Sequence, residues 1–118
     1  MTGFGVRVGL AALAAGLLVS HGAASAADAA KGKILFTQKY GCYQCHGTEG
    51  QGSTVTGPKL APDPMPYEAL ANFVRTSARE MPPYREQILP NEDLADIYAY
   101  LQSIKPAPDY KTIPLLND

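Results

Sequence analysis

The chain has 118 residues, of which 46% are hydrophobic and 18% charged, and these values are ordinary for a soluble fold of one domain. Ten Lys and Arg against eleven Asp and Glu give a formal net charge of −1, without the basic excess that neutralises nucleic-acid phosphates. The composition gives no reason to expect a nucleic-acid partner, and nothing in the length requires a second domain.

The first 26 residues have the pattern of a secretory signal peptide. Arg7 precedes an uncharged run from Val8 to Ser20, and Ala24-Ser25-Ala26 has the small-x-small form of a signal-peptidase site. An uncleaved membrane anchor is the alternative, but a stretch of about 13 apolar residues is shorter than the roughly 20 that span a bilayer. We expect residues 1–26 to be removed and the mature chain to be periplasmic and not membrane-spanning.

The mature chain begins with a predicted helix over about residues 29–40. Asp28 can cap its first turn, apolar residues recur at helical spacing, and Gly41 ends it. Glycine inside a helix costs up to about 1 kcal/mol relative to alanine, so Gly32 needs a compensating reason. We expect the backbone of a C-terminal helix to approach closely at Gly32.

The two cysteines of the chain lie in Cys42-Tyr43-Gln44-Cys45-His46, and Cys-x-x-Cys-His is the attachment motif for c-type haem. Two thiols on one helical turn can each bond a vinyl group of the haem, while His46 binds the iron. The motif predicts one haem c, covalently held by Cys42 and Cys45. Because so short a chain buries a small core, the haem would also complete that core.

Two alternatives explain the cysteines less well. A thioredoxin-like redox pair follows a strand in a βαβ pattern, and no alternating strand run is present. A structural zinc site needs four protein ligands, and the other histidine, His21, lies within the signal segment.

After the motif, Gly47 to Pro66 is rich in glycine and proline and predicts a loop along one haem edge. Helical spacing resumes over about residues 66–77, and Asn91 is a suitable cap for a last helix over about residues 92–104. The prediction is therefore an all-α fold, with three main helices around one covalently bound haem in a domain of residues 27–105.

Residues 106–118 form a proline-rich C-terminal tail that ends in an apolar cluster. Ile113, Leu115 and Leu116 would be unusual in a merely solvated tail. We expect the tail to pack either on the surface of its own domain or against a partner.

The chain resembles the class I cytochrome c family over nearly all of its mature length. Gly32 and Phe36 resemble residues of the family's N-terminal helix, and residues 94–101 resemble its closing helix. Thr56-Gly57-Pro58-Lys59-Leu60 resembles the Gly-Pro-x-Leu loop, and Met81-Pro82-Pro83-Tyr84 the axial methionine loop.

The resemblance implies specific roles at the haem. The Pro58 carbonyl would accept the Nδ1 hydrogen of His46, Met81 would be the sixth iron ligand opposite His46, and Tyr84 would lie beside the sixth-ligand side. Met65 also lies beside prolines, but only Met81 follows the helix over residues 66–77 and precedes the last helix. We expect Met65 to fill the core or to contact the haem edge.

Imidazole and thioether ligands together favour reduced iron, so the implied function is to carry single electrons by Fe(II)/Fe(III) cycling. No catalytic residue can be named, and we expect an electron carrier rather than an enzyme. The expected partners are redox proteins: a dehydrogenase as donor, and an oxidase or another cytochrome as acceptor. We favour a subunit docked on a dehydrogenase over a free shuttle to a terminal oxidase, and Met81 argues against a five-coordinate haem enzyme or gas-binding protein.

The charges predict a basic rim around the exposed haem edge that would steer an acidic partner. Its members would be Lys31, Lys33, Lys39, Lys59, Arg75, Arg79 and Arg85, with Arg75 or Arg79 also a candidate for a haem-propionate contact. The acids Glu86, Glu92, Asp93 and Asp96 would lie apart from this rim.

Overall fold

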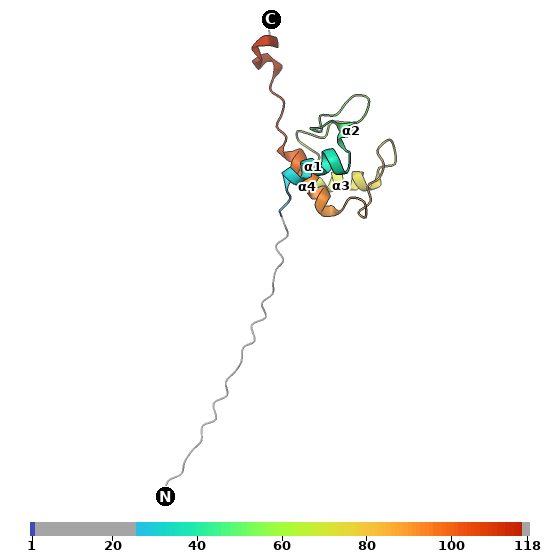
Figure 1. The fold of residues 1–118 in the computed structure, drawn as a ribbon, viewed down its shortest axis with the longest axis vertical. Coiled ribbons are helices and arrows are strands. Elements are labelled where there is room, and N and C mark those ends of the chain that lie inside the picture. The colour runs from blue at the N-terminus through green and yellow to red at the C-terminus, as the bar shows by residue number, and fades with distance from the viewer. Residues whose placement is uncertain (2–25, 117–118) are drawn as a thin grey trace.

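A computed structural model describes residues 26–116 together with Met1 (Figure 1). The predicted signal segment, apart from Met1 and Ala26, lies outside the described residues. The elements in chain order are α1 (Ala29–Ile34), the π-helical turn η1 (Leu35–Lys39), α2 (Tyr43–His46), α3 (Tyr67–Thr76), α4 (Asn91–Ser103), and the 3-10 turns η2 (Tyr110–Thr112) and η3 (Pro114–Leu116).

This part of the chain contains helices and one isolated β-bridge, between Ser53 and Gly57, but no strand, which confirms the all-α prediction. None of its helices is long and apolar enough to cross a membrane.

The first helix begins and ends where the sequence indicates. The Asp28 carboxylate accepts hydrogen bonds from the backbone N–H groups of Ala30 and Lys31, which confirms the predicted cap. The last turn widens to a π-helix, because the Tyr40 N–H bonds to the Leu35 carbonyl at 2.9 Å. Gly41, at a φ of 68°, then turns the chain out of the helix.

Helices α1 and α4 pack closely, as expected from Gly32. The backbone of Gly32 lies against the Asp96 carbonyl, where a Cβ atom would overlap the carbonyl oxygen. Next to this crossing, the rings of Phe36 and Tyr100 lie 5.7 Å apart between centroids. The absent side chain of Gly32 therefore allows the first and last helices to meet.

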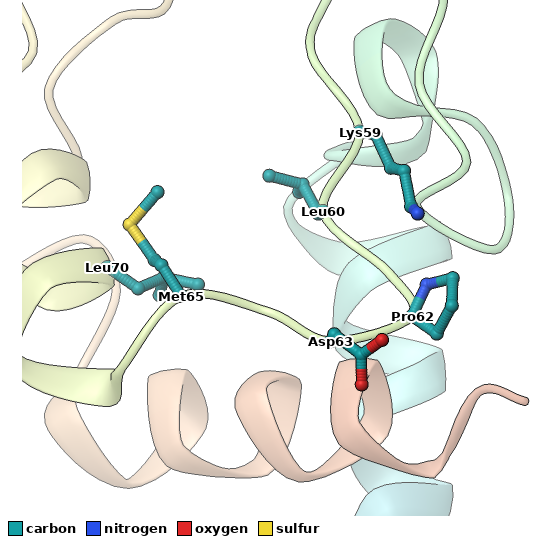
Figure 2. A pocket seen from close by; sticks show the side chains of 6 residues that line it. All are labelled: Lys59, Leu60, Pro62, Asp63, Met65 and Leu70. Carbon is teal, nitrogen blue, oxygen red and sulfur yellow. The ribbon is translucent and has the colours of Figure 1, made fainter. Parts of the chain in front are cut away.

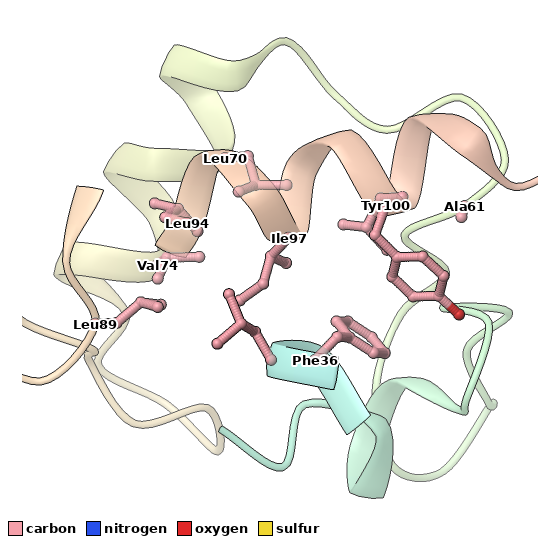
Figure 3. Packing of buried hydrophobic residues seen from close by; sticks show 10 residues of the cluster. Phe36, Ala61, Leu70, Val74, Leu89, Leu94, Ile97 and Tyr100 are labelled. Atoms are coloured by element: carbon pink, nitrogen blue, oxygen red, sulfur yellow. The ribbon is translucent and has the colours of Figure 1, made fainter. Parts of the chain in front are cut away.

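The hydrophobic core joins η1, α3 and α4 (Figure 3). Its buried members are Leu35, Phe36, Ala61, Leu70, Val74, Leu89, Leu94, Ile97, Tyr100 and Leu101. Cys42, Leu60, Met81 and Tyr84 are partly buried and pack against the same cluster. The segment that carries the Cys-x-x-Cys-His motif and the segment that carries Met81 therefore pack against the same core.

A cluster of ion pairs joins the first helical segment of the domain to α4. These ion pairs contradict the predicted charge distribution. Lys31 Nζ lies 3.0 Å from an Asp93 carboxylate oxygen and 2.6 Å from one of Asp96, and Lys39 Nζ lies 2.8 Å from Asp93. The Tyr40 hydroxyl also donates to Asp93, at 2.7 Å. The prediction that these lysines and acids occupy separate regions is wrong, because α1 and η1 bring the lysines to the acids of α4.

The two buried carboxylates of this cluster remain ionised. Hydrogen bonds, first from Lys39 and then from Tyr40, hold the pKa of Asp93 well below its usual range. Burial alone would raise the pKa of Asp96, but the Asp28 N–H and the Lys31 ammonium lower it more. The pKa of Lys31 is raised mainly by its hydrogen bond to Asp96, and the pKa of Lys39 mainly by its hydrogen bond to Asp93.

The start of α4 differs from the sequence expectation. Pro90 occupies the N-cap position, and no side-chain hydrogen bond caps the helix. Asn91 is the first helical residue, and its side chain instead donates to Glu86 Oε1 at 2.7 Å and accepts from Arg75 at 2.9 Å. The predicted Asn91 cap is wrong because the Asn91 side chain finds ionic partners from other segments.

The C-terminal tail runs away from the helices toward the end marked C (Figure 1). Its 3-10 turns bury no residue, and Leu115 and Leu116 are 87% and 60% exposed. The tail therefore does not pack on its own domain, and docking on a partner stays a prediction.

Candidate functional site

The site is built around His46, the last residue of α2. Its side chain is buried, with 7% exposure of the residue, and Nδ1 lies 2.8 Å from the Pro58 carbonyl oxygen. A carbonyl oxygen can only accept, so Nδ1 carries the hydrogen in this contact. The other ring nitrogen, Nε2, is then the one with a lone pair for a metal.

The loop after His46 folds back to bring Pro58 to the ring. The Gly52 N–H bonds to the His46 carbonyl at 2.8 Å, and the Thr56 hydroxyl donates to the Cys45 carbonyl at 2.7 Å. A Cβ atom on Gly57 would lie 3.2 Å from the His46 ring and 3.0 Å from the Cys45 carbonyl oxygen. Glycine therefore permits the close fit of this loop around the motif.

The same loop is anchored to the core at two points. The Tyr100 hydroxyl, on α4, donates to the Thr48 carbonyl at 2.8 Å. The Leu60 and Ala61 N–H groups bond to the Gly50 carbonyl at 2.7 and 3.0 Å. The position of Pro58 is thus fixed by residues on either side of it.

The two thiols lie on the turn that carries His46. Cys42 is the N-cap of α2 and packs against the core, whereas Cys45 is exposed, and neither forms a disulfide. Burial raises the pKa of the Cys42 thiol to about 11. Both sulfurs are therefore available for bonds to another group, one facing inward and one at the surface.

The two candidate methionines differ in their surroundings. Met81 is partly buried against the core, whereas Met65 is 47% exposed. Met65 lies at a pocket of about 260 Å³, where it faces the same space as Leu60 beside α3 (Figure 2). The pocket is lined by Lys59, Leu60, Pro62, Asp63, Met65 and Leu70. Met65 is therefore not a core-filling residue, and its predicted contact with the haem edge stays a prediction.

Tyr84 joins the Met81 loop to the segment before the motif. Its hydroxyl donates to the Tyr40 carbonyl at 3.3 Å, and its N–H donates to the Val74 carbonyl at 2.9 Å. Burial raises the pKa of Tyr84, and the nearby Cys42 and Cys45 thiols raise it further. The structure thus ties Tyr84 to Tyr40, two residues before Cys42, a contact that sequence reasoning did not predict.

The sequence makes Arg75 a candidate for a haem-propionate contact, but the Arg75 guanidinium has protein partners. Nη1 donates to the Tyr84 carbonyl at 2.6 Å, and Nη2 donates to Asn91 Oδ1 at 2.9 Å. Arg79 is exposed. Sequence reasoning missed the Arg75 contacts, since a backbone carbonyl as acceptor leaves no residue-type pattern.

These residues fit a covalently bound haem. A buried imidazole presents Nε2, two free thiols precede it on the same helical turn, and Gly57 permits the loop that orients the ring. Met81 and Cys42 pack against the same core. The fit rests on the side chains that such a group requires and on the hydrogen bond that fixes the imidazole.

The fold and this arrangement define the chain as a small c-type cytochrome domain. A family model described as "Cytochrome C oxidase, cbb3-type, subunit III" matches residues 27–101, so the chain belongs to this family.

Curated relatives include cytochrome c subunits of the cytochrome bc1 complex. The one from Corynebacterium diphtheriae is 32% identical over 84 residues, which cover 70% of this chain and 29% of the relative. The one from Corynebacterium efficiens is 29% identical over 83 residues, which cover 69% and 27%. The chain thus spans less than a third of the length of these relatives. No solved structure matches it.

Proposed function

We propose that this protein is an exported single-haem cytochrome that carries one electron at a time. The matched family and the bc1-complex relatives support haem electron transfer. The observation that carries the proposal is the 2.8 Å contact between His46 Nδ1 and the Pro58 carbonyl, next to two free thiols. This contact orients the His46 imidazole so that Nε2 can bind a metal.

In this proposal, Cys42 and Cys45 would hold the haem through thioether bonds, and His46 Nε2 would bind its iron. When bound, haem c supplies an iron that alternates between Fe(II) and Fe(III). The chain holds the imidazole through Pro58 and surrounds it with the folded loop. No residue is assigned a catalytic role, because the electron enters and leaves without a bond to substrate.

Met81 is the proposed sixth ligand. Its partial burial against the core contrasts with the exposed position of Met65, and Tyr84, three residues later, contacts the segment before Cys42. A thioether ligand together with an imidazole would stabilise reduced iron and raise the reduction potential. The protein would therefore accept electrons readily from a donor of moderate potential.

The proposed location is the periplasm, with residues 1–26 as a cleaved signal, residues 27–105 as the cytochrome domain and residues 106–118 as a tail. The signal pattern supports this division. The family match, which starts at residue 27, also supports it.

For the electron donor, we propose a dehydrogenase on which the exposed tail docks. The relatives support a second candidate, since their names place them in the cytochrome bc1 complex. Rapid-mixing reduction of the oxidised protein by a purified dehydrogenase or bc1 complex from the same organism separates the two. The donor is the enzyme that reduces the cytochrome at least as fast as that enzyme turns over.

The iron ligands are tested by replacing each methionine in the haem-loaded protein. Met81→Ala should abolish the weak sulfur-to-iron absorption band in the far red of the oxidised form, while the matched control Met65→Ala should keep it. Retention of the band in the Met81 variant would contradict the ligand assignment. Absence of covalent haem from the purified wild-type protein, measured by mass spectrometry, would contradict the whole proposal.

A further inference from the structure

The segment that carries Met81 is held mainly at its ends. Between Ser77 and Tyr84, residues 78–83 form no hydrogen bond within the described part of the chain. The Ser77 N–H bonds to the Phe73 carbonyl at 2.9 Å and closes α3. At the other end, Tyr84 is the first residue whose backbone is bonded again, so the contacts of Tyr84 limit how far Met81 can move.

Arg75 makes a charged contact at Tyr84, the C-terminal end of this segment. Its guanidinium donates to the Tyr84 carbonyl at 2.6 Å and to Asn91 Oδ1 at 2.9 Å. Asn91 in turn donates to Glu86 Oε1 at 2.7 Å. One planar, permanently charged side chain on α3 thus joins the end of the Met81 loop to the first residue of α4.

We propose that Arg75 is a positioning residue that keeps Met81 on the haem iron, by clamping the Tyr84 carbonyl to α3 and α4. The inference rests on the proposed function, because it takes Met81 as the sixth ligand. The clamp resists the opening of the loop that would carry the sulfur away. A small ligand that competes with Met81 for oxidised iron measures this opening directly.

The experiment titrates the oxidised, haem-loaded protein with imidazole and follows the loss of the far-red sulfur-to-iron band. Arg75→Gln should bind imidazole about tenfold more tightly or better, because a charge-assisted hydrogen bond no longer opposes loop opening. Asn91→Ala removes one of the two Arg75 acceptors, so it should tighten binding in the same direction by a smaller factor. This milder variant keeps the test decisive where Arg75→Gln does not fold.

Two matched variants separate the clamp from charge alone. Lys105→Gln loses the same charge from an exposed position outside the predicted basic rim and the Met81 loop, and its imidazole affinity should stay within about twofold of wild type. Arg75→Lys keeps the charge but lacks the two-pronged donor, so it should not restore wild-type affinity.

Each outcome bears on one claim. Wild-type imidazole affinity in Arg75→Gln and Asn91→Ala, even with a lowered melting temperature, would show a merely structural role for Arg75 and overturn the inference. Full rescue by Arg75→Lys would overturn the two-point clamp. A far-red band that persists in Met81→Ala would overturn the proposed ligation itself, and the Arg75 inference with it.

Discussion

The backbone of Gly32 in α1 lies against the carbonyl group of Asp96 in α4, with no room for a methyl group between them. Gly32→Ala should therefore destabilise the protein, because overpacking at a backbone contact costs about 1–3 kcal/mol. This loss opposes and should exceed the gain of up to about 1 kcal/mol from replacing glycine in a helix. Denaturant unfolding of the haem-loaded protein, followed by circular dichroism, measures the difference.

Ala30→Gly is the control for helix propensity, since Ala30 is an exposed residue of the same helix. It should cost about 1 kcal/mol through propensity alone. A Gly32→Ala protein as stable as wild type, or more stable, would show that α1 and α4 do not approach as described.

The ionic cluster predicts that stability decreases in acid. The pKa values of Asp93 and Asp96 are depressed in the folded protein, so the unfolded chain takes up protons first as the pH falls. The stabilisation is complete above the ordinary aspartate pKa of about 3.9 and is lost below it, toward the folded pKa values. Urea unfolding from pH 7 to pH 2 should show a fall that steepens below about pH 4.

Asp96→Asn tests whether the ionic cluster causes this loss of stability in acid. The variant should be less stable than wild type at pH 7 and should lose less stability on acidification, since one of the two carboxylates with a depressed pKa is gone, while Lys31 keeps its contact with Asp93. Glu92→Gln, an exposed acid on the same helix, should leave the curve unchanged. If Asp96→Asn lost as much stability on acidification as wild type, the loss would come from other groups.

The thiols predict two distinct attachment defects. Cys42→Ala or Cys45→Ala should each leave at most one thioether bond, which shifts the α-band of the reduced protein. The double variant should yield a haem-free chain without stable structure, because so short a chain has little core of its own. Mass spectrometry and circular dichroism measure haem content and helicity, and a stable apo-fold would contradict this expectation.

Removal of the tail should separate docking from folding. Leu115 and Leu116 are exposed, so a chain that ends at Ala107 should keep the unfolding free energy within about 0.5 kcal/mol and the midpoint potential of wild type. If the tail docks on a partner, the shortened protein should lose co-purification with it. A sharply lower melting temperature with partner binding intact would instead make the tail part of the fold.

Local signals in the sequence predicted much of the fold. The Asp28 cap, the helix stop at Gly41 and the close approach at Gly32 each depend on a few adjacent residues or on one backbone property. The Cys-x-x-Cys-His turn was also visible, because attachment chemistry requires that spacing. The contact between His46 and Pro58 agrees with the family resemblance.

The errors share one physical origin. Asn91 suits an N-cap locally, but its side chain bonds to Arg75 and Glu86 from other segments. Lys31 and Asp96 are far apart in sequence, so their pairing depends on the helix crossing and not on local charge pattern. Arg75 acts on a backbone carbonyl, which no residue type reveals.

The packing of Phe36 against Tyr100 affects the order in which the chain can fold. These rings belong to the first and last helical segments of the domain, so every residue between them must be synthesised before Phe36 meets this partner. A chain that stops short of α4 leaves that face of Phe36 and Leu35 uncovered. The packing that joins the two ends of the domain therefore spans most of its sequence and can form only when α4 is present.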